Sequence, residues 1–227
     1  MKVLIFDTET TGLPKTRVIS PDTLHLWPNL VQFSYLIYDT DSSKNEKICD
    51  FIVRLSEDII ISEESTNIHG ITNEMTRNGA DIDDVFEQFF HDISKVDQIV
   101  GHNVEFDINM IRVELLRIIN NCNYANEVKT VYKEYLFAIT TNTKIFCTMQ
   151  ETIELCNIQV LDKKGKPYAK FPKLVELHEK LFQQTPKNLH NSLNDILVTL
   201  RCYMKIKFNI DVIDVSKEIK KQFKNLL

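Results

Sequence analysis

The chain has 227 residues, of which 43% are hydrophobic, and it carries a formal net charge of −5. This length and apolar content suit one α/β domain, and no stretch approaches the roughly 18 apolar residues of a membrane-spanning helix. The five cysteines lack CxxC spacing, which argues against a zinc site or a disulfide framework and predicts a reduced, intracellular protein. No membrane partner and no cleavable signal are expected.

The first predicted element is a buried strand that runs from Lys2 to Phe6. Asp7 and Glu9 follow, and because residues i and i+2 of a strand share a face, both carboxylates project the same way. Two like charges side by side repel unless a cation lies between them. Gly12 then ends the strand and allows the backbone to approach another group closely. Acidic pairs are also common in solvated turns, so this pair gains meaning only from partners elsewhere in the chain.

The middle of the chain alternates strands with helices. Residues 31–38 alternate apolar and polar side chains as a strand does, and residues 48–55 give a third strand. A helix is predicted over 82–95, with Asp81 or Asp83 as its N-cap. The next elements are a strand at 98–101, a helix at 106–120 and a strand at 144–148. This order predicts an α/β sheet in which three antiparallel strands come first and two strands joined by helices follow.

A third acid, Asp107, lies in the segment IVGHNVEFD at the start of the helix predicted over 106–120. Met110 and Ile111 follow it by three and four residues, so the Asp107 side chain leans toward the buried face of that helix. Taken alone, Asp107 is a first-turn acid that the helix dipole favours.

A fourth acid, Asp195, lies in the helix predicted from the segment LHNSLNDILVTLRCYM. It shares a strip with Ser192 and Thr199 beside the apolar stripe, so it borders the core. His190 precedes Asp195 by five residues, which corresponds to a rotation of about 140° around a helix. Either His190 lies in the loop just before the helix, or the two residues do not act together.

Together these motifs resemble the DEDDh family of metal-dependent 3′→5′ exonucleases, the group that includes the proofreading epsilon subunit of bacterial replicative polymerase. The resemblance rests on FDTETTGL, GHNVEFD and HNSLND, which supply four carboxylates and a histidine in the family's order. Asn191 stands where the tyrosine variant of the family would need Tyr, so the histidine variant is the better match. Secondary matches are the strand VQFSYLIYD, the substrate-side loop STNIHGITNEM and the late helix FPKLVELHEKLF. The resemblance implies an RNase H-like fold with a five-stranded mixed sheet in the order 3-2-1-4-5.

The resemblance also implies a cofactor, two divalent metal ions (Mg²⁺ or Mn²⁺), and a general base, His190. Asp7, Glu9, Asp107 and Asp195 supply four negative charges, which balance two hard cations that prefer oxygen ligands. Two such ions about 4 Å apart activate water, neutralise phosphate charge and stabilise the departing 3′-oxygen. An imidazole near neutral pH can accept the proton of the attacking water. Because the ions would reverse the local field, the net charge of −5 argues only against a long electrostatic grip on nucleic acid.

The same resemblance indicates substrate-binding positions. Leu13 matches a residue that wedges against the terminal base, although a plain packing leucine is an equal alternative. His69 and Ile71 match the loop that lines the nucleotide pocket. Thr10 could offer its backbone or hydroxyl group to the terminal sugar, or a β-branched residue there simply suits the strand. The remaining candidates are Gly12, where the backbone can approach substrate closely, and Asn103, which either bonds substrate or stabilises its own turn.

Two further features have a plain and a functional interpretation. Trp27 could stack on a base, but a lone tryptophan is more often a packing anchor. Lysines at 163, 164, 166 and 170 could hold the phosphate backbone upstream of the scissile bond, with a solvated loop as the default.

The sequence therefore predicts one exonuclease domain over residues 1–227, with a surface insertion at about 120–143 and a basic helix at 215–227. The expected reaction is hydrolysis at the 3′ end of single-stranded or frayed DNA, with release of nucleoside 5′-monophosphates. Three alternatives stay open: an exoribonuclease that trims RNA 3′ ends, a non-catalytic subunit that depends on a polymerase partner, and a structural α/β domain with incidental acids.

Overall fold

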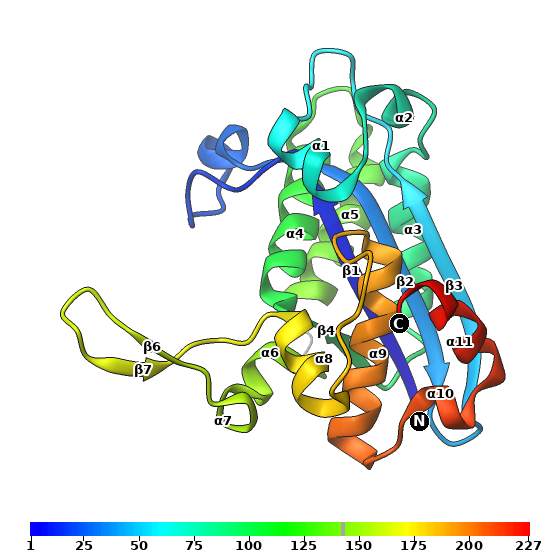
Figure 1. Cartoon of the computed structure of the whole chain (residues 1–227). Coiled ribbons are helices and arrows are strands. Elements are labelled where there is room, and N and C mark those ends of the chain that lie inside the picture. The colour runs from blue at the N-terminus through cyan, green and yellow to red at the C-terminus, as the bar shows by residue number, and fades with distance from the viewer. Residues whose placement is uncertain (142–143) are drawn as a thin grey trace.

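Five strands form a mixed sheet in the order β3-β2-β1-β4-β5 in the computed structural model, which describes residues 1–141 and 144–227 (Figure 1). β1 pairs antiparallel with β2 and parallel with β4, while β3 is antiparallel to β2 and β5 is parallel to β4. The predicted order and pairing are therefore confirmed. The strands are β1 (Lys2–Thr10), β2 (Leu30–Asp39), β3 (Lys44–Ile52), β4 (Gln98–Gly101) and β5 (Ile145–Cys147).

The central strand β1 is covered on both faces. Val3 and Ile5 pack into the apolar core on one face, whereas Leu4 and Phe6 pack into the core on the other. All four side chains are at most 1% exposed. The sequence of β1 is continuously apolar because two separate cores bury its alternate residues.

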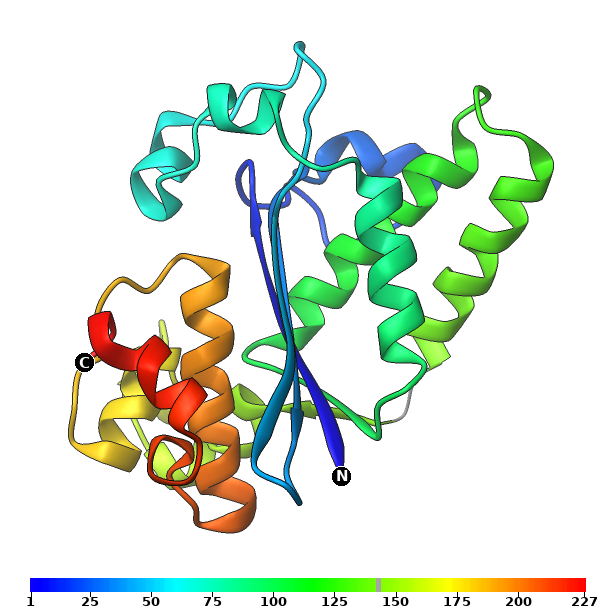
Figure 2. The same ribbon diagram turned by 90° about the vertical axis from the view of Figure 1, so that its right-hand side faces the viewer.

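Helices α3 (Ile82–Ile93), α4 (Val104–Asn120) and α5 (Asn126–Thr141) cover one face of the sheet (Figure 2). Aromatic rings join this layer to the sheet, since Phe89 of α3 meets Phe33 of β2 edge-on with ring centroids 4.9 Å apart.

The segment predicted as a surface insertion, 120–143, contributes α5 to this layer. The Tyr132 hydroxyl donates to Asp83 at 2.6 Å, and the Tyr135 ring stacks on Phe90 with centroids 4.2 Å apart. Residues 142–143 of the predicted insertion lie outside the described residues. The N-cap of α3 is Asp81, and its carboxylate is bound by Arg54 at 3.0 Å instead of by the helix.

The opposite face is covered by α9 (Ser192–Phe208), which is buried continuously from Asp195 to Met204. The predicted single apolar stripe is too narrow, because further helices enclose α9 on the side away from the sheet. Even Arg201 is only 2% exposed, and it pairs with Asp211 at 2.7 Å. The enclosing helices are α8 (Leu174–Phe182), α10 (Val212–Val215), α11 (Lys217–Gln222) and the 3₁₀ turn η2 (Phe223–Asn225), so the predicted basic helix at 215–227 is divided into shorter pieces.

The remaining elements lie around the rim of this sandwich. Helices α1 (Glu63–His69) and α2 (Asn73–Arg77) lie beyond the end of β1 (Figure 1). The 3₁₀ turn η1 (Pro21–Leu26) comes between β1 and β2 in the chain. Two short helices, α6 (Thr148–Glu151) and α7 (Ile153–Cys156), lead from β5 to a hairpin that projects from the body. Its strands are β6 (Gln159–Leu161) and β7 (Pro167–Ala169).

The third strand differs from the prediction at both ends. It begins at Lys44 and ends at Ile52, while Val53 makes only an isolated bridge to Ala80. The polar start was missed because β3 is an edge strand whose early residues face solvent and show no apolar pattern. Pairing with β2, which runs to Asp39 opposite Lys44, is what extends the strand.

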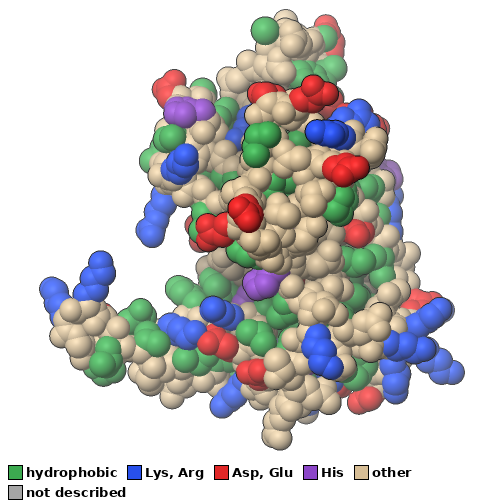
Figure 3. All heavy atoms as spheres, turned by 45° about the horizontal axis from the view of Figure 1, so that its top comes forward, with side chains coloured by type: hydrophobic (Ala, Val, Ile, Leu, Met, Phe, Trp, Pro, Cys, Tyr) green, Lys and Arg blue, Asp and Glu red, His purple; other side chains and the backbone are tan. Residues whose placement is uncertain are grey.

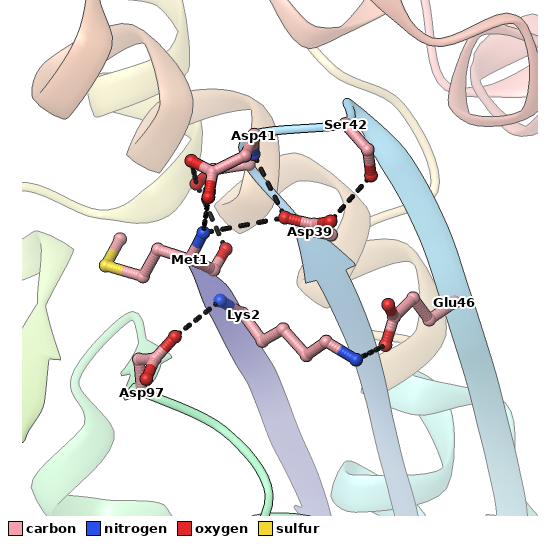
Figure 4. A network of polar contacts seen from close by, with 8 residues as sticks. Met1, Lys2, Asp39, Asp41, Ser42, Glu46 and Asp97 are labelled. Atoms are coloured by element: carbon pink, nitrogen blue, oxygen red, sulfur yellow. Dashed lines mark hydrogen bonds and ion pairs between the residues drawn. The ribbon is translucent and has the colours of Figure 1, made fainter.

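A network of polar contacts fastens the sheet at the end away from α1 (Figure 4). The Lys2 amide donates to Asp97 at 2.8 Å, and its ammonium group pairs with Glu46 at 2.8 Å. The Met1 amino group pairs with Asp39 and Asp41. These groups are largely exposed, so they add little stability, but they connect β1 to β3 and to the loop before β4.

No helix within residues 1–141 and 144–227 is long and apolar enough to cross a membrane. All five cysteines are free thiols, and three of them are buried.

Candidate active site

Asp7 and Glu9 lie near the end of β1 on the face that α9 covers. They share this face with Val3 and Ile5 because successive side chains of a strand alternate. Asp7 lies opposite Ser34 of β2 and Glu9 lies opposite Gln32; the register shifts only after Glu9.

Asp195 in the first turn of α9 completes a group of three acids. Ligand oxygens of Asp7, Glu9 and Asp195 all lie within 4.8 Å of one another. Residues from the two ends of the chain are thus brought together by the packing of α9 across β1 and β2, as the sequence interpretation expected.

A polar cluster holds the start of α9 against the sheet. The Ser192 amide donates to the Gln32 side chain at 3.2 Å, and the hydroxyls of Ser192 and Ser34 share a hydrogen bond. Gln32 and Ser34 each donate to the Asp50 carboxylate at 2.7 Å. Because Gln32, Ser34 and Ser192 are at most 1% exposed, these bonds form in a poorly solvated environment and fix the position of Asp195.

Asp107 approaches from the opposite side of β1. Its Oδ1 accepts hydrogen bonds from the Thr8 amide at 3.0 Å and from the Thr8 hydroxyl at 2.7 Å. Thr8 points away from Asp7 and Glu9 because it lies between them on the strand. Asp107 is not one of the three acids whose ligand oxygens lie within 4.8 Å of one another. It is nevertheless close to them, because its charge is the first of the neighbouring charges that raise the pKa of Asp7.

His190 lies in the loop before α9, which answers the question left open by its spacing from Asp195. It is exposed, and its backbone has a φ of 67°, in the left-handed region that non-glycine residues seldom adopt. Its amide donates to Asp195 Oδ2 at 3.1 Å. The same carboxylate that joins the acidic group thus fixes the backbone of the histidine loop.

Burial raises the pKa of all four carboxyl groups. The pKa of Asp7 lies well above its ordinary range, first through burial and then through the charges of Asp107, Asp195 and Glu9. Burial and the charges of Asp195 and Asp107 raise the pKa of Glu9 to about 8. Burial also raises the pKa of Asp107 to about 7 and that of Asp195 to about 7, against the opposing hydrogen bonds from Thr8 and His190.

The donor set fits divalent cations. Asp195 Oδ1 is buried and has no hydrogen-bond partner among the described residues, although buried polar atoms are almost always paired. A carboxylate oxygen only accepts, so its missing partner is a proton donor or a cation. Clustered carboxylate oxygens, one of them without a hydrogen-bond partner, are the type of ligand that Mg²⁺ and Mn²⁺ prefer.

A cleft of about 630 Å³ opens beside Glu9. Four predicted substrate residues line it: Thr10, Gly12, Leu13 and His69. The cleft has an apolar side that sequence reasoning missed, because Ile60 and Ile68 lie in segments without a clear apolar period. Leu13, Ile60 and Ile68 are 82%, 71% and 51% exposed. Three large apolar side chains exposed in one cleft are typical of a binding surface.

His69 supports the cleft wall through its ring. Its Nε2 lies 3.3 Å from the Thr10 carbonyl, and its Nδ1 accepts from the Ile71 amide at 3.0 Å. Since a carbonyl only accepts, Nε2 carries the proton, and burial lowers the pKa of the ring so that it stays neutral. Ile71 itself is 2% exposed and packs with Val31 and Ile61. Its side chain is therefore part of the core, and we no longer assign it a contact with the nucleotide.

The other predicted contacts have visible internal roles. Asn103 is the N-cap residue of α4 with a φ of 64°, and its carbonyl accepts from the Phe106 amide at 2.9 Å. The Thr10 hydroxyl donates to the Gly12 carbonyl at 2.7 Å. A Cβ added at Gly12 would meet only the Ser65 hydroxyl at 3.9 Å, so nothing within the protein requires a glycine there.

Trp27 is a packing anchor. It is 6% exposed, its indole donates to the Val18 carbonyl at 2.9 Å, and it belongs to the core beneath the cleft.

A mixed five-stranded sheet with helices on both faces, and with acids gathered at the end of its central strand, defines an RNase H-like nuclease. The model of the exonuclease family matches residues 4–203, which is most of the chain. The protein therefore belongs to this exonuclease family, as its motifs predicted.

Solved structures of Exonuclease I share the fold. The E. coli enzyme in complex with a dT13 oligonucleotide aligns with 92% of this chain and 41% of its own, at 15% identity and a TM-score of 0.58. The enzyme from Methylocaldum szegediense aligns with 98% of this chain and 45% of its own, at 16% identity and a TM-score of 0.59. At this identity the likeness establishes the fold alone, and the chain spans less than half of these proteins. No curated protein sequence matches the chain.

Proposed function

We propose that this protein removes nucleotides from the 3′ end of single-stranded or frayed DNA and releases nucleoside 5′-monophosphates. The observation that carries the proposal is the convergence of Asp7, Glu9 and Asp195, with one Asp195 oxygen unpaired, beside an apolar cleft. Exonuclease I structures that contain oligonucleotides support DNA as the substrate. The five free thiols support a reducing, intracellular compartment, and we treat residues 1–227 as one domain.

Asp7, Glu9 and Asp195, together with the neighbouring Asp107, would hold two divalent ions. When bound, such ions polarise the scissile phosphate and lower the pKa of an attacking water. Burial raises the pKa of each acid, and the charges of the neighbouring acids raise the pKa of Asp7 and Glu9 further. Binding a cation therefore relieves this repulsion and releases protons.

His190 takes the proton from the attacking water. A ring nitrogen of His190 accepts the proton, and the exposed position of the side chain lets it pass that proton to solvent. The hydrogen bond from the His190 amide to Asp195 holds the loop at the edge of the acidic group. The position of the histidine relative to the carboxylates is therefore fixed.

The terminal nucleotide lies in the cleft beside Glu9. Leu13, Ile60 and Ile68 give the terminal base an apolar surface, and packing of the base would exclude water from this part of the site. Thr10 and Gly12 follow the acids on the strand and place backbone groups beside the sugar, while His69 holds that backbone in position.

The test uses single- and double-stranded oligonucleotides, DNA and RNA, labelled at the 3′ or the 5′ end, in Mg²⁺ or with chelator. We expect mononucleotides from the 3′ end of single-stranded DNA, and no products with chelator. Internal products, 5′-end release or activity in chelator would overturn the proposal. Faster digestion of the matched RNA would replace it with the exoribonuclease alternative.

A further inference from the structure

The β6–β7 hairpin is an isolated ribbon at the surface. We define residues 158–171 as the lysine arm. It comprises the strands Gln159–Leu161 and Pro167–Ala169, the turn between them, one residue before the first strand and two residues after the second. The arm projects from the body beside the segment that follows β5 (Figure 1), and its two strands pair only with each other. Two strands alone are marginally stable, so such an arm needs either local order or a partner.

Local order comes from the turn. Asp162 Oδ1 accepts from the amides of Lys164 and Lys166, both at 2.8 Å, and the Gly165 amide donates to the Asp162 carbonyl at 2.9 Å. Gly165 has a φ of 77°, which favours glycine. The one acid of the turn is therefore used by the backbone, and the turn displays its lysines in a defined arrangement.

Lys163, Lys164 and Lys166 are exposed, and none of them pairs with a carboxylate of the described residues. Lys170 differs, because it pairs with Glu176 at 2.6 Å at the base of the arm. Three unpaired cations thus gather at the tip of an arm in a protein whose net charge is −5.

The arm also carries exposed apolar surface. Leu161, Tyr168 and Phe171 are 69%, 51% and 52% exposed. Aromatic rings beside cations are the combination that holds a single nucleic-acid strand, since the rings stack on bases while the cations bind phosphates. A protein partner would use the apolar residues but would not need three cations at the tip.

The arm is connected to the catalytic side of the molecule at its base. His102, in the turn before α4, contacts Thr148 through Nδ1 at 2.9 Å and the Pro172 carbonyl through Nε2 at 3.1 Å. Burial lowers the pKa of this ring to about 4, so it stays neutral and donates from Nε2 to the carbonyl. The end of the arm is thereby fixed to the turn that leads to Asp107.

A second group of basic side chains lies on the lobe that faces the lysine arm across a recess. Lys15 and Arg17 are exposed on the segment between β1 and η1, and Lys15 lines the cleft. Figure 3 shows Lys and Arg side chains at the tip of the arm and on the lobe that faces it across a recess. A strand that leaves the cleft through this recess would pass between the two groups.

We propose that the lysine arm binds the backbone of the single strand upstream of the 3′ end, so that long substrates bind more tightly than short ones. This inference rests on the proposed function, because it assigns the arm to the same substrate as the cleft.

The test compares Lys163→Ala/Lys164→Ala/Lys166→Ala with a charge-matched control, Lys217→Ala/Lys220→Ala/Lys221→Ala, which removes three exposed lysines of α11. Binding of a labelled oligothymidine is measured by fluorescence anisotropy in Ca²⁺ over a range of salt. Since a single strand contributes about 0.7 to the salt slope per phosphate contact, we expect the arm variant to lose about 2 from the slope and at least about tenfold in affinity. The control should bind like the unchanged protein.

Hydrolysis separates this inference from the proposed function. With Mg²⁺ we expect the arm variant to show a higher KM for oligothymidine at an unchanged kcat, and unchanged hydrolysis of the p-nitrophenyl ester of thymidine 5′-monophosphate, which is too short to reach the arm. If the unchanged protein hydrolyses neither substrate, the proposed function fails, while the anisotropy comparison still decides the role of the arm.

A Lys→Arg version of all three positions keeps the charge and should restore binding. Equal affinities and salt slopes for the arm variant and the control would overturn the inference. So would binding of the arm to anionic phosphatidylserine vesicles without binding to oligothymidine.

Discussion

The acidic group and the lysine arm place charge in opposite environments. Asp7 lies half-buried on the face of β1 that α9 covers, and burial with like charges nearby raises its pKa well above the ordinary range. Lys163, Lys164 and Lys166 extend into solvent at the end of a ribbon. Charge buried without a partner destabilises the fold and is kept where reaction chemistry needs it, whereas exposed charge has little effect on stability and contributes to binding through long-range attraction.

The largest expected effect comes from the acidic group. Asp7→Asn removes the central carboxylate, and we expect kcat on single-stranded DNA to fall by about 10³-fold or more, as for loss of a preorganised electrostatic group. Asp84→Asn, an exposed acid of α3, is the matched control and should keep full activity. Melting curves verify that both variants are folded; a folded Asp7→Asn protein with normal kcat would show that the group is not catalytic.

Substitution of His190 tests whether this exposed histidine beside the acidic group takes part in proton transfer. His190→Ala should lower kcat by about 10²–10⁴-fold with little change in KM. His91→Ala, an exposed histidine of α3, serves as the control. An unchanged kcat in the His190 variant would leave the histidine with a structural role in its loop.

The pH dependence of stability tests whether the acids are under repulsion. The pKa values of Glu9, Asp107 and Asp195 in the folded protein are about 8, 7 and 7, above their ordinary values. Between about pH 4 and pH 8 the folded state therefore holds more protons than the unfolded state, and in chelator the free energy of unfolding should fall as the pH rises. Chemical denaturation at several pH values measures this.

Two changes should reduce the loss of stability at high pH. Asp7→Asn should raise the free energy of unfolding in chelator at pH 8 by about 1–3 kcal/mol, because it removes a buried charge. Millimolar Mg²⁺ or Mn²⁺ should stabilise the unchanged protein by mass action and should stabilise the variant less. A stability that is flat from pH 4 to pH 8 and insensitive to metal would contradict the proposed ion site.

The smallest expected effect concerns the apolar wall of the cleft. Leu13 is 82% exposed, so Leu13→Ala should change stability by less than about 0.5 kcal/mol. Loss of an apolar contact with the terminal base, worth about 0.7–1.4 kcal/mol, should raise KM about threefold to tenfold. Val18→Ala, an exposed residue outside the cleft, is the control; equal KM values for both variants would remove Leu13 from the binding surface.

Much of the fold follows from local sequence patterns. The strand at 98–101 was predicted with the bounds that β4 has, and the predicted helix over 82–95 differs from α3 by two residues at its end. These segments have the apolar period of the element they form. The start of β3 has none, and its length is set by pairing with β2 rather than by its own residues.

The candidate site was predictable as a set of residues but not as a geometry. Alternation along a strand placed Asp7 and Glu9 on one face. The five-residue spacing between His190 and Asp195 left two alternatives, and the structure shows His190 in the loop before α9. The same alternation puts Thr8 on the other face, where it binds Asp107, but only the position of α4 shows this. Similarly, Ile71 matched a pocket loop by sequence, while its burial depends on Val31 and Ile61 from other segments.

The sequence by itself determined the order of strands and helices, the identity of the acids and the composition of the lysine arm, because each depends on neighbouring residues. The tertiary structure decided which acids meet, how far burial raises their pKa values and that the arm extends from the body. Those properties depend on distances between residues far apart in the chain and on what excludes water from them.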